Sequence, residues 1–128
     1  MTKYLIDSSA WIEYFLSSNK GFKVKEIIEE EKNEVFTHVL SIAEISSKLT
    51  RSGIDPTQSN SIINSLSETI NIDDEVSFKA GKLHAEIRKE IKDFGLVDAF
   101  ILLGAKENLM KIVTTDSHFK KNKETIMI

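Results

Sequence analysis

The sequence has no cysteine at all and only one proline among its 128 residues. Without thiols the chain can form neither a disulfide framework nor a thiolate metal site, so nothing requires an oxidising compartment. The N-terminal stretch MTKYLIDSSAW lacks the basic-then-apolar pattern of a signal peptide. The longest apolar stretch, around Asp98, is about half as long as a membrane-spanning helix. These absences predict a cytoplasmic protein that does not associate with membranes.

Hydrophobic residues make up 41% of the chain, which is enough for one globular domain with a sizeable core. We expect residues 1–128 to form that single domain, because no linker, repeat or low-complexity segment interrupts them. The net charge of −3 argues against a nucleic-acid binder of the histone type, which depends on overall positive charge. It does not argue against an enzyme whose active site is itself acidic.

Short β-leaning runs alternate with longer helical patterns along the chain. The strand candidates are KYLID, EVFTH, TINID, KIVTTD and TIMI. An amphipathic helix is expected over residues 75–92, and another after the start signal Asp55–Pro56; residues 8–17 and 40–50 complete the set. The resulting order, β-α-α-β-α-α-β-α-α-β-β, predicts a three-layer α/β/α fold with a central parallel sheet of four to five strands.

Several acidic residues stand at strand ends or inside apolar helical stretches. Asp7 and Asp116 each close a strand run, and a doubly wound sheet binds ligands beyond the carboxyl ends of its strands, where the strand order reverses. If these two strands are neighbours at that point, both carboxylates lie in one crevice. Asp98 opens the apolar helix GLVDAFILLGA, where an unpaired buried charge would be costly. The first turn of this helix is expected at the same edge of the sheet, so the three acids would converge in that crevice. Glu44, in the apolar stretch VLSIAEI, is a fourth candidate.

Each of these acids also has a purely structural interpretation. Asp7 can cap the helix that follows it, and Asp116 can cap the turn DSHFK. Glu44 stands three residues after Ser41, which is the capping-box spacing. Asp98 can be a first-turn carboxylate that the helix dipole stabilises. The joint pattern favours a site, because four independent caps need not fall on two strand ends and two apolar helices.

Four motifs in this order resemble the PIN-domain nucleases, and specifically the VapC-type toxin ribonucleases of type II toxin–antitoxin systems. An apolar strand that ends in Asp-Ser-Ser appears as YLIDSSAWIEYF, and a glutamate after the second strand as VLSIAEISSKL. The third motif appears as GLVDAFILLGAK, and the fourth, Thr-x-Asp-x-x-Phe, as TTDSHF. The third motif continues with Leu-Leu-Gly-Ala where Ala-rich sequence is usual, and the final strand is very short. The resemblance covers nearly the whole chain, and neither departure affects an acid.

The resemblance implies a Mg²⁺-dependent endoribonuclease that is the toxin of a toxin–antitoxin pair. Asp7, Asp98 and Asp116 would be metal ligands, and Glu44 would orient the attacking water or complete the metal shell. Four close carboxylates repel one another, and a hard cation such as Mg²⁺ or Mn²⁺ relieves that repulsion. In-line hydrolysis would leave a 5′-phosphate and a 3′-hydroxyl. Hydroxyls that can support the metal ligands, unless they only satisfy backbone groups, are those of Ser8, Thr114 and Thr115.

Basic residues near the acidic site are expected to contact the phosphates of an RNA substrate. The run HFKKNK supplies three of them, which are Lys120, Lys121 and Lys123. A second set along the long helix also fits a solvated helix face, and it comprises Lys79, Lys82, Arg88 and Lys89. No paired ligand spacing connects the three histidines, so a zinc site is not expected. Two of them, His38 and His84, are interpreted as surface or boundary residues.

The first helix is more apolar than one buried face requires. Trp11 and Phe15 stand four residues apart, among Ile12, Tyr14 and Leu16. These side chains either all belong to the core or form part of a surface for an antitoxin helix or strand. The resemblance also implies a homodimer face on the helices around residues 40–69.

Two other functions stay open. A phosphoacceptor receiver domain is also a doubly wound sheet with acids at its strand ends and Mg²⁺, but it needs an acid pair after the first strand, where this chain has Ser8. It also needs a phosphorylated Asp after a mid-chain strand, and Asp73 and Asp74 are better read as helix caps. The second alternative is a catalytically silent PIN-like module that binds RNA or protein. The presence of all four acids favours an active enzyme.

Overall fold

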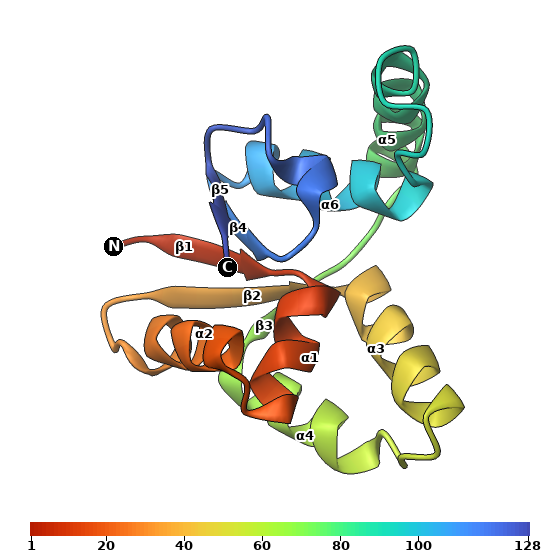
Figure 1. The fold of residues 1–128 in the computed structure, drawn as a ribbon. Helices are drawn as coiled ribbons and strands as arrows, with labels where there is room; N and C mark the ends of the chain where they lie inside the picture. The colour runs from red at the N-terminus through yellow and green to blue at the C-terminus, as the bar shows by residue number, and fades with distance from the viewer.

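Five short strands form a wholly parallel sheet in the order β3-β2-β1-β4-β5 in the computed structural model, which describes residues 1–128 (Figure 1). The strands are β1 (Lys3–Ile6), β2 (Glu34–His38), β3 (Glu68–Ile70), β4 (Lys111–Thr114) and β5 (Thr125–Met127). The order reverses between β1 and β4, whose register pairs Ile6 with Val113. The predicted parallel sheet is therefore confirmed, and the strands that end at Asp7 and before Asp116 are neighbours.

Helices cover both faces of this sheet, as Figure 1 shows. They are α1 (Ser8–Leu16), α2 (Asn19–Glu29), α3 (Val39–Arg51), α4 (Thr57–Leu66), α5 (Asp74–Ile87) and α6 (Leu96–Glu107), with a 3₁₀ turn η1 (Ser117–Phe119) after β4. The observed order of strands and helices is the predicted one. No helix has the length and apolar content that would carry it through a bilayer.

The core lies in two layers because successive strand residues point to opposite faces of the sheet. Leu5 and Ile112 are fully buried on the face covered by α5 and α6, where they pack with Phe94 and Ile101. The residues that follow them, Ile6 and Val113, are buried on the other face with side chains of α1 to α4 such as Trp11, Val24, Ile45 and Ile63. Apolar packing on both faces thus holds the carboxyl ends of β1 and β4 in place.

The helix predicted over residues 75–92 is shorter than expected, since α5 ends at Ile87. Beyond it the backbone tightens into turns, in which the N–H of Glu90 bonds to the carbonyl of Ile87 and that of Phe94 to the carbonyl of Ile91. These turns bury Phe94, which is 1% exposed, against the sheet. Burial of a phenylalanine side chain contributes about 1.5–3 kcal/mol, which favours these turns. The segment then leads directly into α6.

The receiver-domain alternative is wrong. A receiver has the flavodoxin-like strand order 2-1-3-4-5, whereas β1 here lies between β2 and β4. Asp73 is a helix cap, because its Oδ1 accepts a 2.8 Å hydrogen bond from the N–H of Val76, and Asp74 is the first residue of α5. The expected start of α4, with Asp55 as the cap and Pro56 as the first helical residue, is wrong by one residue. Pro56 occupies the N-cap position, and α4 begins at Thr57, whose N–H donates to Asp55 Oδ1.

Candidate active site

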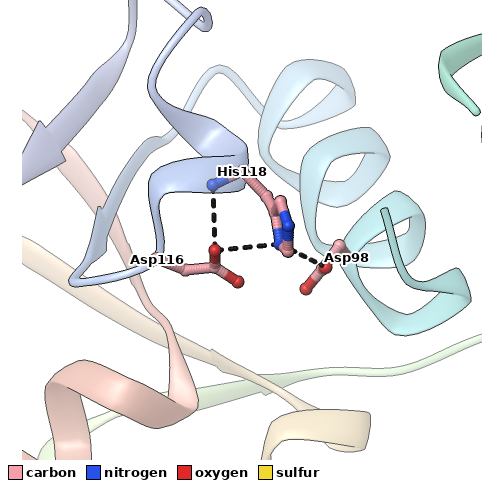
Figure 2. A group of neighbouring side chains, drawn as sticks. All are labelled: Asp98, Asp116 and His118. Atoms are coloured by element: carbon pink, nitrogen blue, oxygen red, sulfur yellow. Dashed lines mark hydrogen bonds and ion pairs between the residues drawn. The ribbon is translucent and has the colours of Figure 1, made fainter. Parts of the chain in front are cut away.

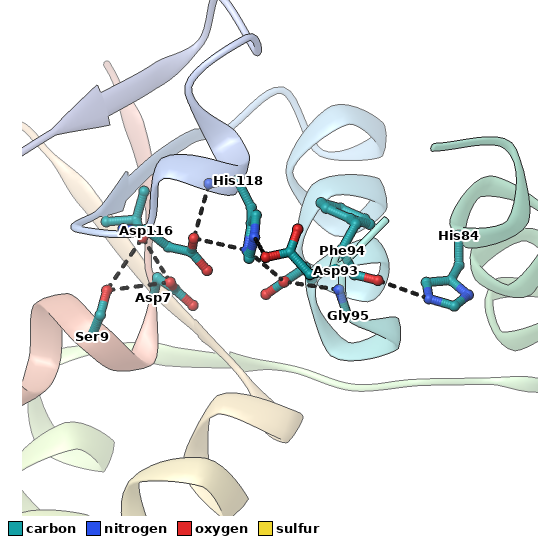
Figure 3. Close-up of polar contacts among 10 residues, drawn as sticks. Asp7, Ser9, His84, Asp93, Phe94, Gly95, Asp116 and His118 are labelled. Atoms are coloured by element: carbon teal, nitrogen blue, oxygen red, sulfur yellow. Dashed lines mark hydrogen bonds and ion pairs between the residues drawn. The ribbon is translucent and has the colours of Figure 1, made fainter. Parts of the chain in front are cut away.

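Three of the predicted acids lie at the carboxyl edge of the sheet where β1 meets β4 (Asp98 and Asp116 in Figure 2, Asp7 and Asp116 in Figure 3). Asp7 directly follows β1, and its N–H donates to the carbonyl of Val113, so its backbone continues the pairing with β4. Asp116 follows β4 and precedes η1, which the buried ring of Phe119 holds against the core. Asp98 lies in the first turn of α6. Asp7 is 5% exposed, and the other two are half-buried.

Hydroxyl groups hold the Asp7 carboxylate. Thr114 Oγ1 donates a 2.7 Å hydrogen bond to Asp7 Oδ2 and accepts one of 2.9 Å from the N–H of Asp116. Ser9 Oγ lies 3.4 Å from the same carboxylate oxygen and accepts from the N–H of Thr115. Asp7 occupies the N-cap position of α1, yet its side chain makes no capping bond. Its interpretation as a helix cap is therefore wrong, because the carboxylate is bound from β4 instead.

Burial makes the charged form of Asp7 unfavourable. Desolvation raises the pKa of this carboxyl to about 6, although the hydrogen bond from Thr114 acts in the opposite direction. The negative charges of Asp98 and Asp116 raise the pKa further. A bound divalent cation would lower this pKa again, since the cation favours the ionised form of the carboxyl.

The structural interpretations of Asp98 and Asp116 both hold, and each uses one carboxylate oxygen. Asp98 Oδ2 accepts a 3.2 Å hydrogen bond from the N–H of Gly95, as a first-turn carboxylate does. Asp116 Oδ1 accepts one of 2.9 Å from the N–H of His118 and so caps η1. Burial raises the pKa of Asp98, and the negative charge of Asp116 adds to this. The capping bonds thus orient both carboxylates, and partial burial disfavours the charged form of Asp98.

His118 joins these acids, and sequence reasoning missed it. Its Nδ1 lies 3.0 Å from Asp116 Oδ1 and 3.6 Å from Asp98 Oδ2 (Figure 2). Its Nε2 lies 3.1 Å from Oδ2 of Asp93, and this contact is the main cause of its raised pKa. The available signal was its place within TTDSHF, two residues after Asp116. Spacing between histidines does not reveal His118, because its partners are carboxylates.

Glu44 lies on the wall of a cleft between the start of α1 and α3, near enough to the three aspartates to interact with their charges. The cleft is about 460 Å³ and is also lined by Ser8, Ser9, Lys48 and Arg51. Partial burial raises the pKa of Glu44, and the charges of the three aspartates add to the effect. The Ser41–Glu44 capping box is wrong, because α3 begins at Val39 and its cap is His38, whose Nδ1 accepts from the N–H of Leu40.

His38 also corrects a second expectation. It is not a surface or boundary residue, since it is 1% exposed, and burial lowers its pKa to about 4. A neutral imidazole is what the cap needs, because only an unprotonated Nδ1 can accept the N–H of Leu40. His84 does lie at the boundary, with Nε2 3.0 Å from the carbonyl oxygen of Phe94.

Comparison with known proteins settles the family. A sequence model of the PIN domain matches residues 4–124. The chain belongs to the PIN domain family. Comparison with curated protein sequences gave no significant match.

The fold of this PIN domain is similar to that of toxins and toxin–antitoxin complexes. A toxin–antitoxin complex from Klebsiella pneumoniae matches with a TM-score of 0.74 and 18% identity over 97% of this chain and 96% of the other. VapBC2 from Rickettsia felis, bound to a promoter DNA fragment, matches with a TM-score of 0.75 and 17% identity over 99% of this chain and 98% of the other. VapC20 from Mycobacterium tuberculosis, a toxin that cleaves the sarcin–ricin loop, matches with a TM-score of 0.74 and 13% identity over 94% of this chain and 95% of the other. At these identities the likeness concerns the fold.

The donor atoms of this PIN domain fit a divalent cation. Asp98, Asp116 and His118 each offer one ligand atom, and these atoms lie within 4.8 Å of one another. Carboxylate oxygens are the ligands that hard divalent ions prefer, and their close approach without such an ion is electrostatically unfavourable. Asp7 stands outside this tight group but is joined to the backbone of Asp116 through Thr114.

The hydroxyls expected to support these ligands divide into two groups. Thr114 contacts Asp7 directly, as described above. Ser8 instead lines the cleft beside Glu44, and Thr115 contributes its backbone N–H to Ser9. Ser9 was not singled out from the sequence, although it is the second serine of the DSS motif. The path of the first turn of α1 decides that Ser9, and not Ser8, places its hydroxyl near the Asp7 carboxylate.

The expected substrate cations lie on the surface after η1. Lys120, Lys121 and Lys123 are exposed, and the last two line a cleft of about 500 Å³ together with His118 and Phe119. On the long helix, Lys79 pairs with Glu75 at 3.0 Å and with Glu107 at 3.2 Å. Lys89 lies 3.9 Å from Glu86. For these two lysines the solvated-face interpretation fits better.

The aromatic side chains of α1 belong only partly to the core. Trp11 is fully buried and donates a 3.0 Å hydrogen bond from Nε1 to Oγ1 of Thr37. Tyr14 and Phe15 are half-buried, and Leu16 is 66% exposed. Phe22 on the adjacent α2 is 54% exposed. Part of the apolar surface on α1 and α2 is therefore left uncovered by the chain itself.

Proposed function

We propose that this PIN domain is a divalent-metal-dependent endoribonuclease that hydrolyses RNA phosphodiester bonds and is the toxin of a toxin–antitoxin pair. The observation that carries the proposal is the meeting of Asp7, Asp98 and Asp116 at the edge of β1 and β4, in a chain that matches the PIN family over residues 4–124. The fold does not require three carboxylates at this edge. The capping bonds of Asp98 and Asp116 use only one oxygen of each carboxylate and leave the other oxygen available.

The position of each acidic residue suggests its role in the proposed reaction. Asp98 and Asp116 would ligate Mg²⁺ or Mn²⁺ together with Asp7, and Thr114 would keep the Asp7 carboxylate oriented. When bound, the cation supplies acidification of the attacking water and stabilisation of negative charge on the phosphate. Glu44, in the cleft beside Ser8, would orient that water or complete the metal shell.

The RNA backbone would approach past Lys120, Lys121 and Lys123. Their support comes from position, because they directly follow η1, and two of them line the cleft that contains His118. Lysine side chains beside an acidic centre attract the phosphates of RNA and do not recognise particular bases. Replacing Lys121 and Lys123 by Ala should raise KM for RNA and leave kcat nearly unchanged.

A cognate antitoxin is the proposed protein partner. The likeness to the Klebsiella pneumoniae and Rickettsia felis complexes supports it, as does the exposed apolar surface formed by Leu16 and Phe22. A second copy of the chain is proposed to pack against α3 and α4, where Ile54 in the connecting loop is 50% exposed and Leu66 is 37% exposed. A monodisperse monomer at micromolar concentration would contradict the homodimer.

The test is cleavage of single-stranded RNA by the purified chain with Mg²⁺ and with EDTA. Cleavage is expected only with the metal, and Asp98→Asn should abolish it while the far-UV circular dichroism stays unchanged. Asp73→Asn is the matched control, because it makes the same substitution at an exposed acid that caps α5, where Asn is an equally good cap. Undiminished cleavage by Asp98→Asn would refute the assignment. Metal-dependent RNA binding without cleavage would instead indicate the catalytically silent module.

A further inference from the structure

The environment of His118 differs at its two ring nitrogens. Nε2 faces Asp93, a side chain that is 81% exposed and lies on the solvent side. Nδ1 faces inward, 3.0 Å from Asp116 and 3.6 Å from Asp98, and it is shielded from solvent without a hydrogen-bond partner. Figure 2 shows the ring standing between the two carboxylates. One nitrogen therefore has a carboxylate acceptor outside the site, and the other points into the acidic group.

This arrangement is the one that a metal-ligating histidine normally has. A histidine that binds a metal through one nitrogen almost always donates the other N–H to a carboxylate, a carbonyl or water, which selects the tautomer and orients the ring. Asp93 is placed to accept that proton from Nε2, so the lone pair of Nδ1 is left facing Asp98 and Asp116. A lone pair directed at two carboxylates is repulsive unless a cation lies between them.

We propose that His118 is a nitrogen ligand to the divalent cation, together with Asp98 and Asp116, and that Asp93 orients it. The inference rests on the proposed function only in taking this edge of the sheet as the metal site. Imidazole nitrogen suits first-row transition ions, whereas Mg²⁺ prefers oxygen ligands alone. The site therefore favours Mn²⁺ over Mg²⁺ more strongly than three carboxylates would.

The competing explanation is that His118 is a protonated counter-ion that neutralises the acids. In that case the metal would displace it, and removing the imidazole would strengthen or leave unchanged the binding of any cation. The two explanations predict opposite changes for the same substitution, so metal binding alone separates them, with no need for RNA cleavage.

The test is electron paramagnetic resonance of the full chain with MnCl₂. Electron spin-echo modulation from ¹⁴N should appear on the bound Mn²⁺ in the wild type and disappear in His118→Gln. The free-ion signal should show Mn²⁺ binding weakened at least about tenfold by that substitution. Competition with MgCl₂ should show Mg²⁺ binding changed much less. Asp93→Asn should keep the nitrogen signal and weaken Mn²⁺ binding by about tenfold, because the ring loses its charged partner.

His84→Gln is the matched control, since it removes another partly buried imidazole that lies away from the acids and should leave both readouts unchanged. Absence of ¹⁴N modulation in the wild type with Mn²⁺ bound would overturn the inference, even if His118→Gln failed to fold. So would tight Mn²⁺ binding by folded His118→Gln. Cleavage of RNA without the nitrogen signal would remove this inference and keep the proposed function, and the nitrogen signal without cleavage would do the reverse.

Discussion

The hydroxyl of Thr114 donates a 2.7 Å hydrogen bond to Oδ2 of Asp7, and so joins two residues that are 107 positions apart in the sequence. The contact follows from the register of the central strands, because Ile6 pairs with Val113 and the next residue of each strand is then the other's neighbour. Thr114 is fully buried, so the bond is made away from competing water. It opposes the desolvation that raises the pKa of Asp7.

Thr114→Val should destabilise the protein by about 1–3 kcal/mol, because the N–H of Asp116 loses its acceptor and Asp7 loses its donor in a buried place. It should also raise the pKa of Asp7 further. Urea unfolding measures the first effect, and Thr115→Val is the control, since the hydroxyl of Thr115 makes neither bond. Equal destabilisation by the two variants would show that the threonine hydroxyl is not the cause.

Asp7→Asn should make the metal-free protein more stable near neutral pH. The folded pKa of Asp7, about 6, lies above its value of 3.8 without burial, so the stability linked to this group is complete below 3.8 and is lost as the pH rises through 6. The variant should therefore exceed the wild type by up to about 3 kcal/mol at pH 7 and match it near pH 4. Unfolding free energies in metal-free buffer across this range provide the measurement. A difference in unfolding free energy between the two proteins that does not change with pH would contradict the raised pKa of Asp7.

Addition of Mg²⁺ or Mn²⁺ should raise the melting temperature, because the ion binds the folded carboxylates and has no assembled site in the unfolded chain. At a hundred times the dissociation constant the gain is about 2.7 kcal/mol. Asp98→Asn and Asp116→Asn should each lose most of this gain, whereas Asp73→Asn should keep it. Differential scanning fluorimetry with and without EDTA is sufficient. A gain of equal size in all three variants would place the ion elsewhere.

Gly21→Ala should disrupt the packing of α1 against α2. A Cβ at this position would overlap the carbonyl oxygen of Glu13, and backbone cannot move aside as a flexible side chain can. We expect a loss of about 1–3 kcal/mol or more. Gly81→Ala is the control with the opposite sign, since nothing lies within 4 Å of its Cβ and Ala stabilises an exposed helix by about 0.5–1 kcal/mol. Thermal unfolding of both variants tests the pair, and a tolerated Gly21→Ala would show that α2 can shift.

Most of the fold was predictable because its signals are local. Four strands lie within the runs that predicted them, β3 overlaps its run, and the cap Asp73 stands next to the helix it begins. The end of α5 was not predictable, since the burial of Phe94 against the sheet, and not the helical periodicity of residues 75–92, decides where the chain turns. His38 was misplaced for the same reason, because its burial depends on the helices packed over it.

The sequence by itself determined the order of strands and helices and the position of the three aspartates at the end of a strand or the start of a helix, because hydrophobic periodicity and capping act over a few residues. Only the tertiary structure decided that β1 and β4 are neighbours, that Thr114 and not Ser8 reaches Asp7, and that His118 stands between Asp98 and Asp116. Local patterns specify which side of an element is buried. Which distant side chains then meet depends on the strand order and on the register of the sheet, and neither is encoded within any one segment.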